Sequence, residues 1–236
     1  IINIYGIDAN YYYLTESLCW PILKEIVEEK LMADPEQVND RMRELSLKLP
    51  VDSDIQIAIR FIEQSAWYYA QVRGLGTLKL NSTREYIEKY TEEFYLVDLY
   101  YRRTLEAYHE LITKENPIEQ TLSSAKRQLD LEYAKIANVL NLEWLTCVGE
   151  KGAWFTETGL KRQEDFYKNE SDTSVKQVVI VCDALRYEVA KELMQELAKE
   201  KHIATIDAYQ AMLPTETKYC KPALLPHHSL ELNGTD

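Results

Sequence analysis

An apolar periodicity of three and four residues over positions 87–112 constrains the fold more than any other feature. These steps place eight side chains on one face of a long helix. Ser82 is predicted to cap this helix, and Glu85 falls three residues later, at the spacing of a capping box. Only seven glycines and seven prolines occur in 236 residues, so the sequence predicts a mainly helical region. The eight positions are Ile87, Tyr90, Phe94, Val97, Tyr101, Leu105, Tyr108 and Ile112.

Further helices are predicted on both sides of this one. A second long helix begins near Pro117, and two long helices joined by a short connection are expected to pack antiparallel. Segments at about residues 15–32, 36–47 and 54–73 also show helical patterns, separated by prolines. The tyrosines of this region could stack on nucleic-acid bases. Few lysines and arginines are interleaved with them, so packing between helices is the favoured interpretation.

Composition and charge limit the classes of protein to which the chain can belong. The net charge is −12, and residues 1–172 hold 30 acidic against 20 basic side chains. So acidic a segment repels a phosphate backbone and is not expected to wrap nucleic acid. No apolar run approaches the length of about 20 residues that spans a bilayer. The four cysteines form no CxxC pair, so neither a disulfide framework nor a structural zinc site is expected, which fits a reducing cytoplasm.

An unbroken, mostly β-branched run at Val178–Cys182 precedes the first candidate functional residue. Such a run is typical of a strand buried on both faces of a parallel sheet. Asp183 follows at once, and a helical pattern then runs from Leu185 to Leu197. Ligands of open α/β sheets bind beyond the carboxyl ends of strands, so Asp183 is a candidate metal ligand. The alternative is that Asp183 caps the following helix, and the motif alone does not separate these interpretations.

A second predicted strand, Ile203–Ala208, leads to a loop that holds hydroxyl residues. Pro214 favours a turn, and Thr215 and Thr217 fall where a helix would start. A threonine hydroxyl is a weak nucleophile until a metal or a base activates it, and a metal bound by Asp183 would supply that activation. The alternative is again that one of the two threonines caps a helix.

The segments VVIVCDALRYEVAKEL and LPTETKYCKPALLPHHSLEL together resemble a known family. The first places D-A-L-R-Y-E-x-A after a strand, and the second runs a Pro-x-x-Thr loop into A-L-L-P-H. Both are similar to the start of a PglZ domain, a branch of the alkaline phosphatase superfamily, and the second is most similar to the PglZ proteins of BREX phage-defence systems. The two motifs cover about 60 residues. The helical region, including YLVDLYYRR, resembles more loosely the segment before that domain.

The fold class expected is α+β. Residues 1–172 would form a helical domain, and residues 173–236 would begin an alkaline-phosphatase-like α/β domain that is truncated here. Because the chain starts at Ile1 without an initiator methionine, we interpret it as an internal fragment.

The resemblance implies a two-metal centre, with two zinc ions, that hydrolyses phosphoesters. Asp183 matches the family's first metal-binding aspartate, and Thr217 matches the nucleophile that also contacts the metal, with Thr215 as the second choice. Cys220 departs from the glycine usual in the family, so an altered turn after Thr217 is expected. The remaining ligands would lie beyond Asp236, and the fragment alone is expected to be inactive. The two adjacent histidines fall outside the family's ligand set and are expected to be surface or packing residues: His227 and His228.

The function expected is therefore that of a metal-dependent phosphodiesterase or phosphatase in a BREX anti-phage system. Its partners would be other BREX components, including a DNA methyltransferase and accessory proteins. Its substrate would be a phosphoester, with nucleic acid as one possibility, and its location would be cytoplasmic, away from membranes. One alternative is a non-catalytic scaffold of the defence complex with a degenerate phosphatase-like domain. Another is a signalling effector, but no receiver domain is visible upstream.

Overall fold

A computed structural model describes residues 12–47, 49, 53–149, 158–172 and 174–231. The chain divides into two compact units, Ile1–Cys147 and Val148–Asp236. These units divide at residues 147–148, whereas the domain boundary was predicted at residues 172–173. The domain boundary stays a prediction. Among the described residues no helix is both long enough and apolar enough to cross a membrane.

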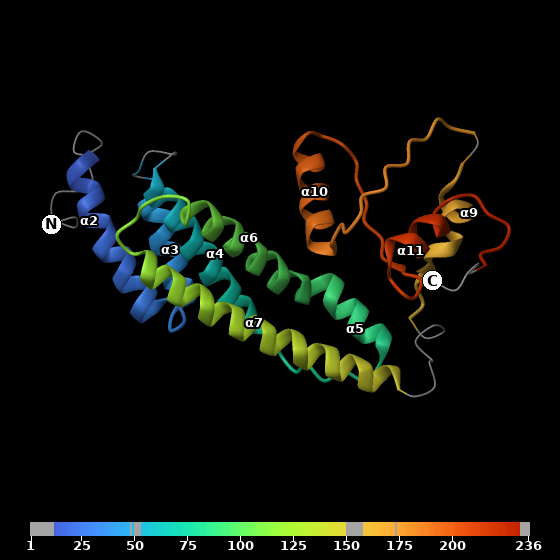
Figure 1. Ribbon diagram of the computed structural model, residues 1–236, viewed down its shortest axis with the longest axis horizontal. Coiled ribbons are helices and arrows are strands. Elements are labelled where there is room, and N and C mark those ends of the chain that lie inside the picture. The colour runs from blue at the N-terminus through green and yellow to red at the C-terminus, as the bar shows by residue number, and fades with distance from the viewer. Residues whose placement is uncertain (1–11, 48, 50–52, 150–157, 173, 232–236) are drawn as a thin grey trace. The chain divides into compact units, whose positions relative to one another are not determined.

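The first unit is built of helices (Figure 1). They confirm the helices predicted from the sequence, with small differences at the ends. Two short π-helical segments, η2 and η3, interrupt the α-helical hydrogen bonding without ending the helices that contain them. In chain order the elements are α2 (Tyr12–Glu25), η2 (Ile26–Lys30), α3 (Pro35–Ser46), α4 (Asp54–Gly74), α5 (Thr83–Lys89), η3 (Tyr90–Phe94), α6 (Tyr95–Leu111) and α7 (Glu119–Val148).

Side chains at helix starts explain where several of these helices begin. Asp34 accepts a hydrogen bond from the backbone N–H of Gln37, and Pro35 occupies the first position of α3. Ser82 accepts from the backbone N–H of Glu85 at 3.2 Å, and the carboxylate of Glu85 accepts from the N–H of Asn81. The predicted cap at Ser82 is thus confirmed. Each such cap satisfies an N–H group that has no partner within the helix, and typically stabilises it by about 1 kcal/mol.

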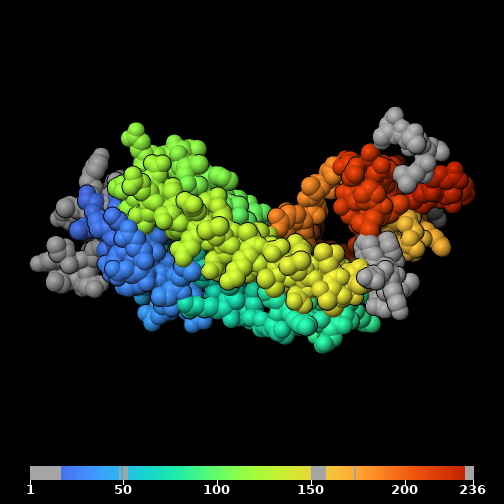
Figure 2. Space-filling view, turned by 60° about the horizontal axis from the view of Figure 1, so that its bottom comes forward, coloured from blue at the N-terminus to red at the C-terminus, as the bar shows by residue number. Residues whose placement is uncertain are grey.

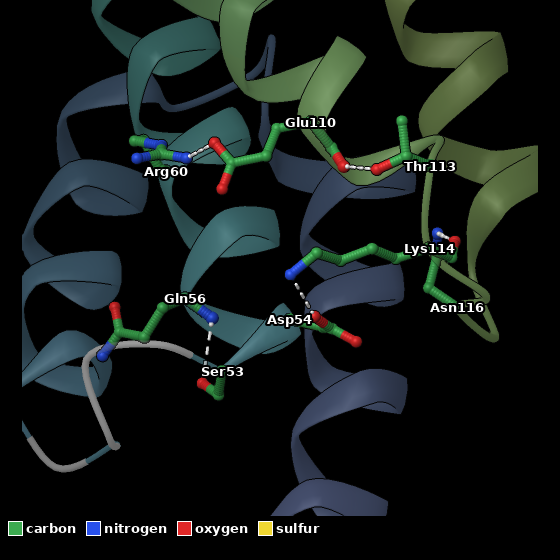
Figure 3. Close-up of polar contacts among 8 residues, drawn as sticks. All are labelled: Ser53, Asp54, Gln56, Arg60, Glu110, Thr113, Lys114 and Asn116. Atoms are coloured by element: carbon green, nitrogen blue, oxygen red, sulfur yellow. Dashed lines mark hydrogen bonds and ion pairs between the residues drawn. The ribbon is translucent and has the colours of Figure 1, made fainter.

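The core of this unit lies around α4, whose apolar residues are buried on several sides against α3 and α6. Phe61 and Tyr68 are among its largest fully buried side chains. Ion pairs join the exposed side of α4 to α6 and to the turn that follows α6 (Figure 3). Lys114 Nζ lies 2.8 Å from Asp54 Oδ1 at the start of α4, and one turn and a half further along Arg60 pairs with Glu110 of α6.

Tyrosines join α6 to α7 and establish that the two helices are antiparallel. The ring of Tyr101 stacks on that of Tyr133 with centroids 3.7 Å apart. Further along α6, the hydroxyl of Tyr108 is hydrogen-bonded to Ser123, which lies earlier on α7. Progress along one helix therefore runs backward along the other, as predicted. These tyrosines pack between helices, which confirms that interpretation over base stacking.

The predicted single apolar face of residues 87–112 is only partly correct. Leu111 is buried whereas Ile112 is exposed, and Tyr86 is buried more deeply than Ile87. The π-helical segment η3 adds a residue to one turn and rotates the faces on either side of it relative to each other. Because α6 also contacts α4 on one side and α7 on another, it buries more than one stripe.

The outer side of α7 forms a continuous band across the helical unit (Figure 2). Leu129 on its inner side is 1% exposed, whereas Leu131, two positions later, is 66% exposed. One face of α7 is thus buried in the core, and the opposite face is exposed.

In the described residues of the second unit, two short strands pair in parallel, β1 (Lys161–Arg162) and β2 (Tyr209–Gln210), with Lys161 opposite Tyr209. Both predicted strands are wrong in this structure. Val178–Cys182 is extended but unpaired and exposed, and Ile180 is 80% exposed. Ile203–Ala208 also lacks strand pairing, and β2 begins directly after it. A strand inside a parallel sheet pairs with a neighbouring strand at each edge. Among the described residues, neither run has such a strand beside it.

The remaining elements of the second unit are short helices. The α10 helix confirms the helix predicted after Asp183, although Leu193 on its apolar side is half exposed. The described residues of this unit thus form helices and a two-stranded sheet, and the start of an α/β domain stays a prediction. These elements are η4 (Gln163–Asp165), α9 (Phe166–Glu170), α10 (Tyr187–Lys199) and α11 (Thr217–Ala223).

Candidate active site

Asp183 and Thr217 lie together in the second unit although 34 positions separate them in the chain. The Thr217 hydroxyl donates to the Asp183 carboxylate, with Oγ1 3.2 Å from Oδ2 and 3.4 Å from Oδ1. Thr217 is the first residue of α11, and Asp183 lies in the turn before α10. Both side chains are exposed, so a ligand can reach them.

Neither residue caps the helix that follows it. The residue at the capping position of α10 is Arg186, three positions after Asp183, and its side chain pairs with Glu188 at 2.8 Å. The capping position of α11 is Glu216, and no side chain caps that helix either. The capping interpretations of Asp183 and Thr217 therefore do not describe this structure.

Backbone strain marks the turn that carries Asp183. Ala184 has a φ of 55°, in the left-handed region that an L-residue other than glycine enters at a cost of about 1 kcal/mol. Such strain is retained where the surroundings impose a particular backbone path. Here that path brings the Asp183 carboxylate to α11.

Lys221 is a third member of the cluster, which the sequence interpretation did not assign to the site. Its Nζ lies 3.1 Å from Oδ2 of Asp183. The hydrogen bond and charge of Lys221, followed by the hydrogen bond from Thr217, hold the pKa of Asp183 below its usual range. Asp183 is thus ionised near neutral pH and is a poor acceptor for the proton of a hydroxyl, whose pKa is far higher. Activation of Thr217 therefore needs another group.

Gln163 is a second residue that the sequence interpretation missed. Its Oε1 accepts from the backbone N–H of Met212 at 3.0 Å, and its Nε2 donates to the carbonyl of Cys220 at 3.2 Å. One amide thus ties both ends of the segment that carries Thr217 to the turn after β1. No motif singles out this glutamine, because its role depends on contacts across about 50 residues of chain.

Cys220, which departs from the glycine usual in the family, is part of a helix. Cys220 lies inside α11 with helical backbone, and the helix continues to Ala223. Its Sγ lies 3.7 Å from the carbonyl oxygen of Met212. The expected alteration of this turn relative to the family stays a prediction.

The donor set at the site fits one ligand position of a divalent metal ion. A carboxylate and a hydroxyl are oxygen donors that zinc and harder cations accept. Among the described residues, however, no group of three or more His, Cys, Asp and Glu side chains converges. His227 is exposed and its Nδ1 is 2.7 Å from the carbonyl of Leu225, and His228 is also exposed, so both are surface residues as predicted.

Comparison with known proteins finds similar sequences for the segment that carries this cluster. Residues 164–236, which include the whole cluster except its supporting Gln163, match the family described as the BREX system PglZ alkaline phosphatase-like domain. The chain is 29% identical over 178 residues to the alkaline phosphatase-like protein PglZ of Bacillus cereus (strain H3081.97). Residues 164–236 are thus similar to PglZ domains. Since that alignment covers 72% of this chain, the likeness to PglZ extends into the helical unit.

A second PglZ-family relative agrees with the first. The chain is 38% identical over 79 residues to the alkaline phosphatase-like protein BrxZ of Escherichia coli O9:H4 (strain HS), an alignment that covers 30% of this chain. The chain spans only 20% of the length of the Bacillus cereus PglZ and 9% of that of BrxZ. No solved structure matches the chain.

Proposed function

We propose that residues 164–236 carry part of the active site of a metal-dependent phosphoester hydrolase in a BREX defence system. Thr217 is the nucleophile and Asp183 is a metal ligand. The hydrogen bond from Thr217 to Asp183 is the observation that supports this most strongly. It joins two residues from separate motifs, neither of which is used to cap a helix.

The chemistry of the cluster supports a metal rather than Asp183 as the activating group. With its lowered pKa, Asp183 cannot serve as an efficient general base for the Thr217 hydroxyl. A divalent ion bound by Asp183 lowers the pKa of a hydroxyl beside it and polarises the phosphoester. We propose two zinc ions, as in the expected site of the family, with the remaining ligands contributed by residues that follow Asp236.

The proposed reaction transfers the phosphorus of the substrate to Thr217. The Oγ atom of Thr217 gives its proton to solvent and forms a bond to phosphorus. The bond from phosphorus to the leaving oxygen breaks, and the alcohol departs after taking a proton from solvent. Water then attacks the same phosphorus and releases the Thr217 oxygen, which regains a proton. Asp183 holds the hydroxyl in place before the attack, as its 3.2 Å contact with Oγ1 allows.

The test uses the intact protein, with zinc binding and hydrolysis of an activated aryl phosphodiester as readouts. Thr217→Ala should reduce turnover by about 10³-fold or more while the circular dichroism spectrum is unchanged. Thr215→Ala is the matched control and should retain activity, because Thr215 lies in the same loop while the threonine hydroxyl bonded to Asp183 is that of Thr217. Full turnover in the Thr217→Ala protein would sink the assignment.

A non-catalytic scaffold is the second candidate. Two observations favour it. Among the described residues, no two further metal-ligating side chains lie beside Asp183. The helical unit is also larger than is needed to hold a catalytic site in place. On this account the intact protein binds no zinc and still captures its BREX partners, including the DNA methyltransferase. Zinc binding lost on Asp183→Asn would argue against the scaffold and for the hydrolase. A cytoplasmic location is part of both proposals.

A further inference from the structure

Lys221 and Thr217 meet the same carboxylate oxygen. They lie four positions apart on α11, so their side chains project from the same face of that helix. Lys221 Nζ is 3.1 Å from Asp183 Oδ2, and Thr217 Oγ1 is 3.2 Å from the same atom. The carboxylate that the proposed function assigns to a metal ion is therefore already neutralised by a cation of the protein.

This geometry sets two cations in competition. A divalent ion binds a carboxylate through its negative charge, and the ammonium group of Lys221 satisfies that charge at a distance typical of a direct ion pair. An ion that approaches Oδ2 must either displace Lys221 or bind beside a like charge. Lys221 is 47% exposed on its side chain, so water can receive the ammonium group when it leaves.

We propose that Lys221 is a positioning residue that competes with the divalent ion for Asp183, holding the carboxylate against Thr217 until the ion displaces it. The inference rests on the proposed function, since it needs Asp183 to be a metal ligand. It adds a form of regulation: Lys221 weakens metal binding, so the site loads only at a higher concentration of the ion.

Lys218 offers a matched control on the same helix. It carries the same charge, its side chain is 58% exposed, and it pairs with Glu216 at 3.5 Å instead of with Asp183. Substitution of either lysine by methionine removes one positive charge from α11. Only substitution of Lys221 removes the competitor from the Asp183 carboxylate.

The experiment measures zinc affinity of the intact protein by competition with a chromophoric chelator, without any assay of activity. Lys221→Met should bind zinc about five- to tenfold more tightly than the wild type, from the loss of one unit charge near the ion in a solvated site. Lys218→Met should stay within about twofold of the wild type, because a charge further from the ion is screened by water. Lys221→Arg keeps the charge and should also retain wild-type affinity.

The outcomes separate this inference from the proposed function. Equal zinc affinity of Lys221→Met and Lys218→Met, or weaker binding by Lys221→Met, overturns the competition while leaving the metal site in place. A purely structural role for Lys221 would lower the melting temperature without tightening zinc binding, and this result also overturns it. Zinc binding that appears only in Lys221→Met supports the competition in its strongest form. Absence of zinc binding from every variant overturns the proposed metal site and the inference with it.

Discussion

The Thr217 hydroxyl lies 3.2 Å from Oδ2 of Asp183, so that the side chain at the start of one helix is held by the turn that precedes another. This contact orients the oxygen of Thr217. Lys221 first, and Thr217 after it, hold the pKa of Asp183 below its usual range, so the carboxylate is ionised. An ionised carboxylate beside a hydroxyl can bind a cation, but it cannot readily take the hydroxyl proton. The pair therefore supports the proposal that Thr217 is a nucleophile which a metal ion would activate.

Gln163→Ala should loosen the segment that carries Thr217. The substitution removes both bonds of the amide, to Met212 and to Cys220, each worth about 1 kcal/mol. Backbone amide hydrogen exchange over residues 212–220 should then become about tenfold faster, since local opening costs less. Gln177→Ala is the control, because the Gln177 amide likewise makes two hydrogen bonds to the backbone, accepting from Asp172 and donating to Glu170, away from Thr217. Equal exchange in both variants would show that Gln163 does not hold the segment.

Leu129→Ala should destabilise the helical unit by about 2–5 kcal/mol, because Leu129 is in the core and its truncation leaves a cavity. Leu131→Ala on the same helix changes an exposed side chain and should cost no more than about 0.5 kcal/mol. Urea unfolding of the 236-residue chain, followed by far-ultraviolet circular dichroism, measures both. Similar midpoints for the two variants would mean that α7 does not pack on the core by this face.

The helices of the first unit could be predicted because their determinants are local. Ser82 and the apolar steps that follow it specify a start and a face within a few residues. The prediction of one buried face was wrong at Ile112, which is exposed. The π-helical segment η3 and packing against both α4 and α7 bury side chains that a single periodicity does not select. The strand predicted at Val178–Cys182 failed because a strand depends on neighbours distant in sequence. Its β-branched residues favour a strand, but the described residues provide no strand with which it could pair.

The candidate site was predictable only in part for the same reason. Asp183 and Thr217 stand in recognisable motifs, and their proximity agrees with that prediction. Lys221 lies within one motif, but its bond to Asp183 depends on how α11 meets the turn before α10. Gln163 lies outside both motifs, and only the folded chain brings it to Met212.

Tyr133→Phe should reduce the free energy of unfolding by about 1 kcal/mol. The substitution keeps the ring stacked on Tyr101 and removes only the hydroxyl, which donates to Asp98 Oδ1 at 2.8 Å. A double-mutant cycle with Asp98→Asn isolates this bond, and a coupling energy of about 0.5–1.5 kcal/mol is expected. A coupling energy of zero would contradict a contribution of this hydrogen bond to the contact between α6 and α7.

The helical unit should lose stability at alkaline pH. Burial raises the pKa of Tyr69 to about 12, and burial together with the bond to Asp130 raises that of Tyr101 to about 12. The unfolded chain releases these protons near a pH of 10.0 while the folded chain keeps them. The contribution of these two tyrosines to the free energy of unfolding should therefore be fully retained below that pH and be lost as the pH rises through about 12.

Urea unfolding at a series of alkaline pH values measures this decline. Tyr69→Phe and Tyr101→Phe should each make the slope shallower, because each removes one of the titrating hydroxyls. Ultraviolet titration of the folded chain provides the control. Ionisation of all tyrosines near the ordinary value would contradict the burial of these two side chains.

The central claim is that Thr217 is the nucleophile, and the most direct measurement is to find the phosphorus on it. The intact protein, supplied with zinc, is mixed with an activated aryl phosphomonoester, quenched with acid and digested for peptide mass spectrometry. A phosphate is expected on the Oγ of Thr217, absent from Thr217→Ala and still present on Thr217 in Thr215→Ala. Release of the aryl alcohol at the full rate by Thr217→Ala, or a phosphate found on Thr215 instead, would contradict it.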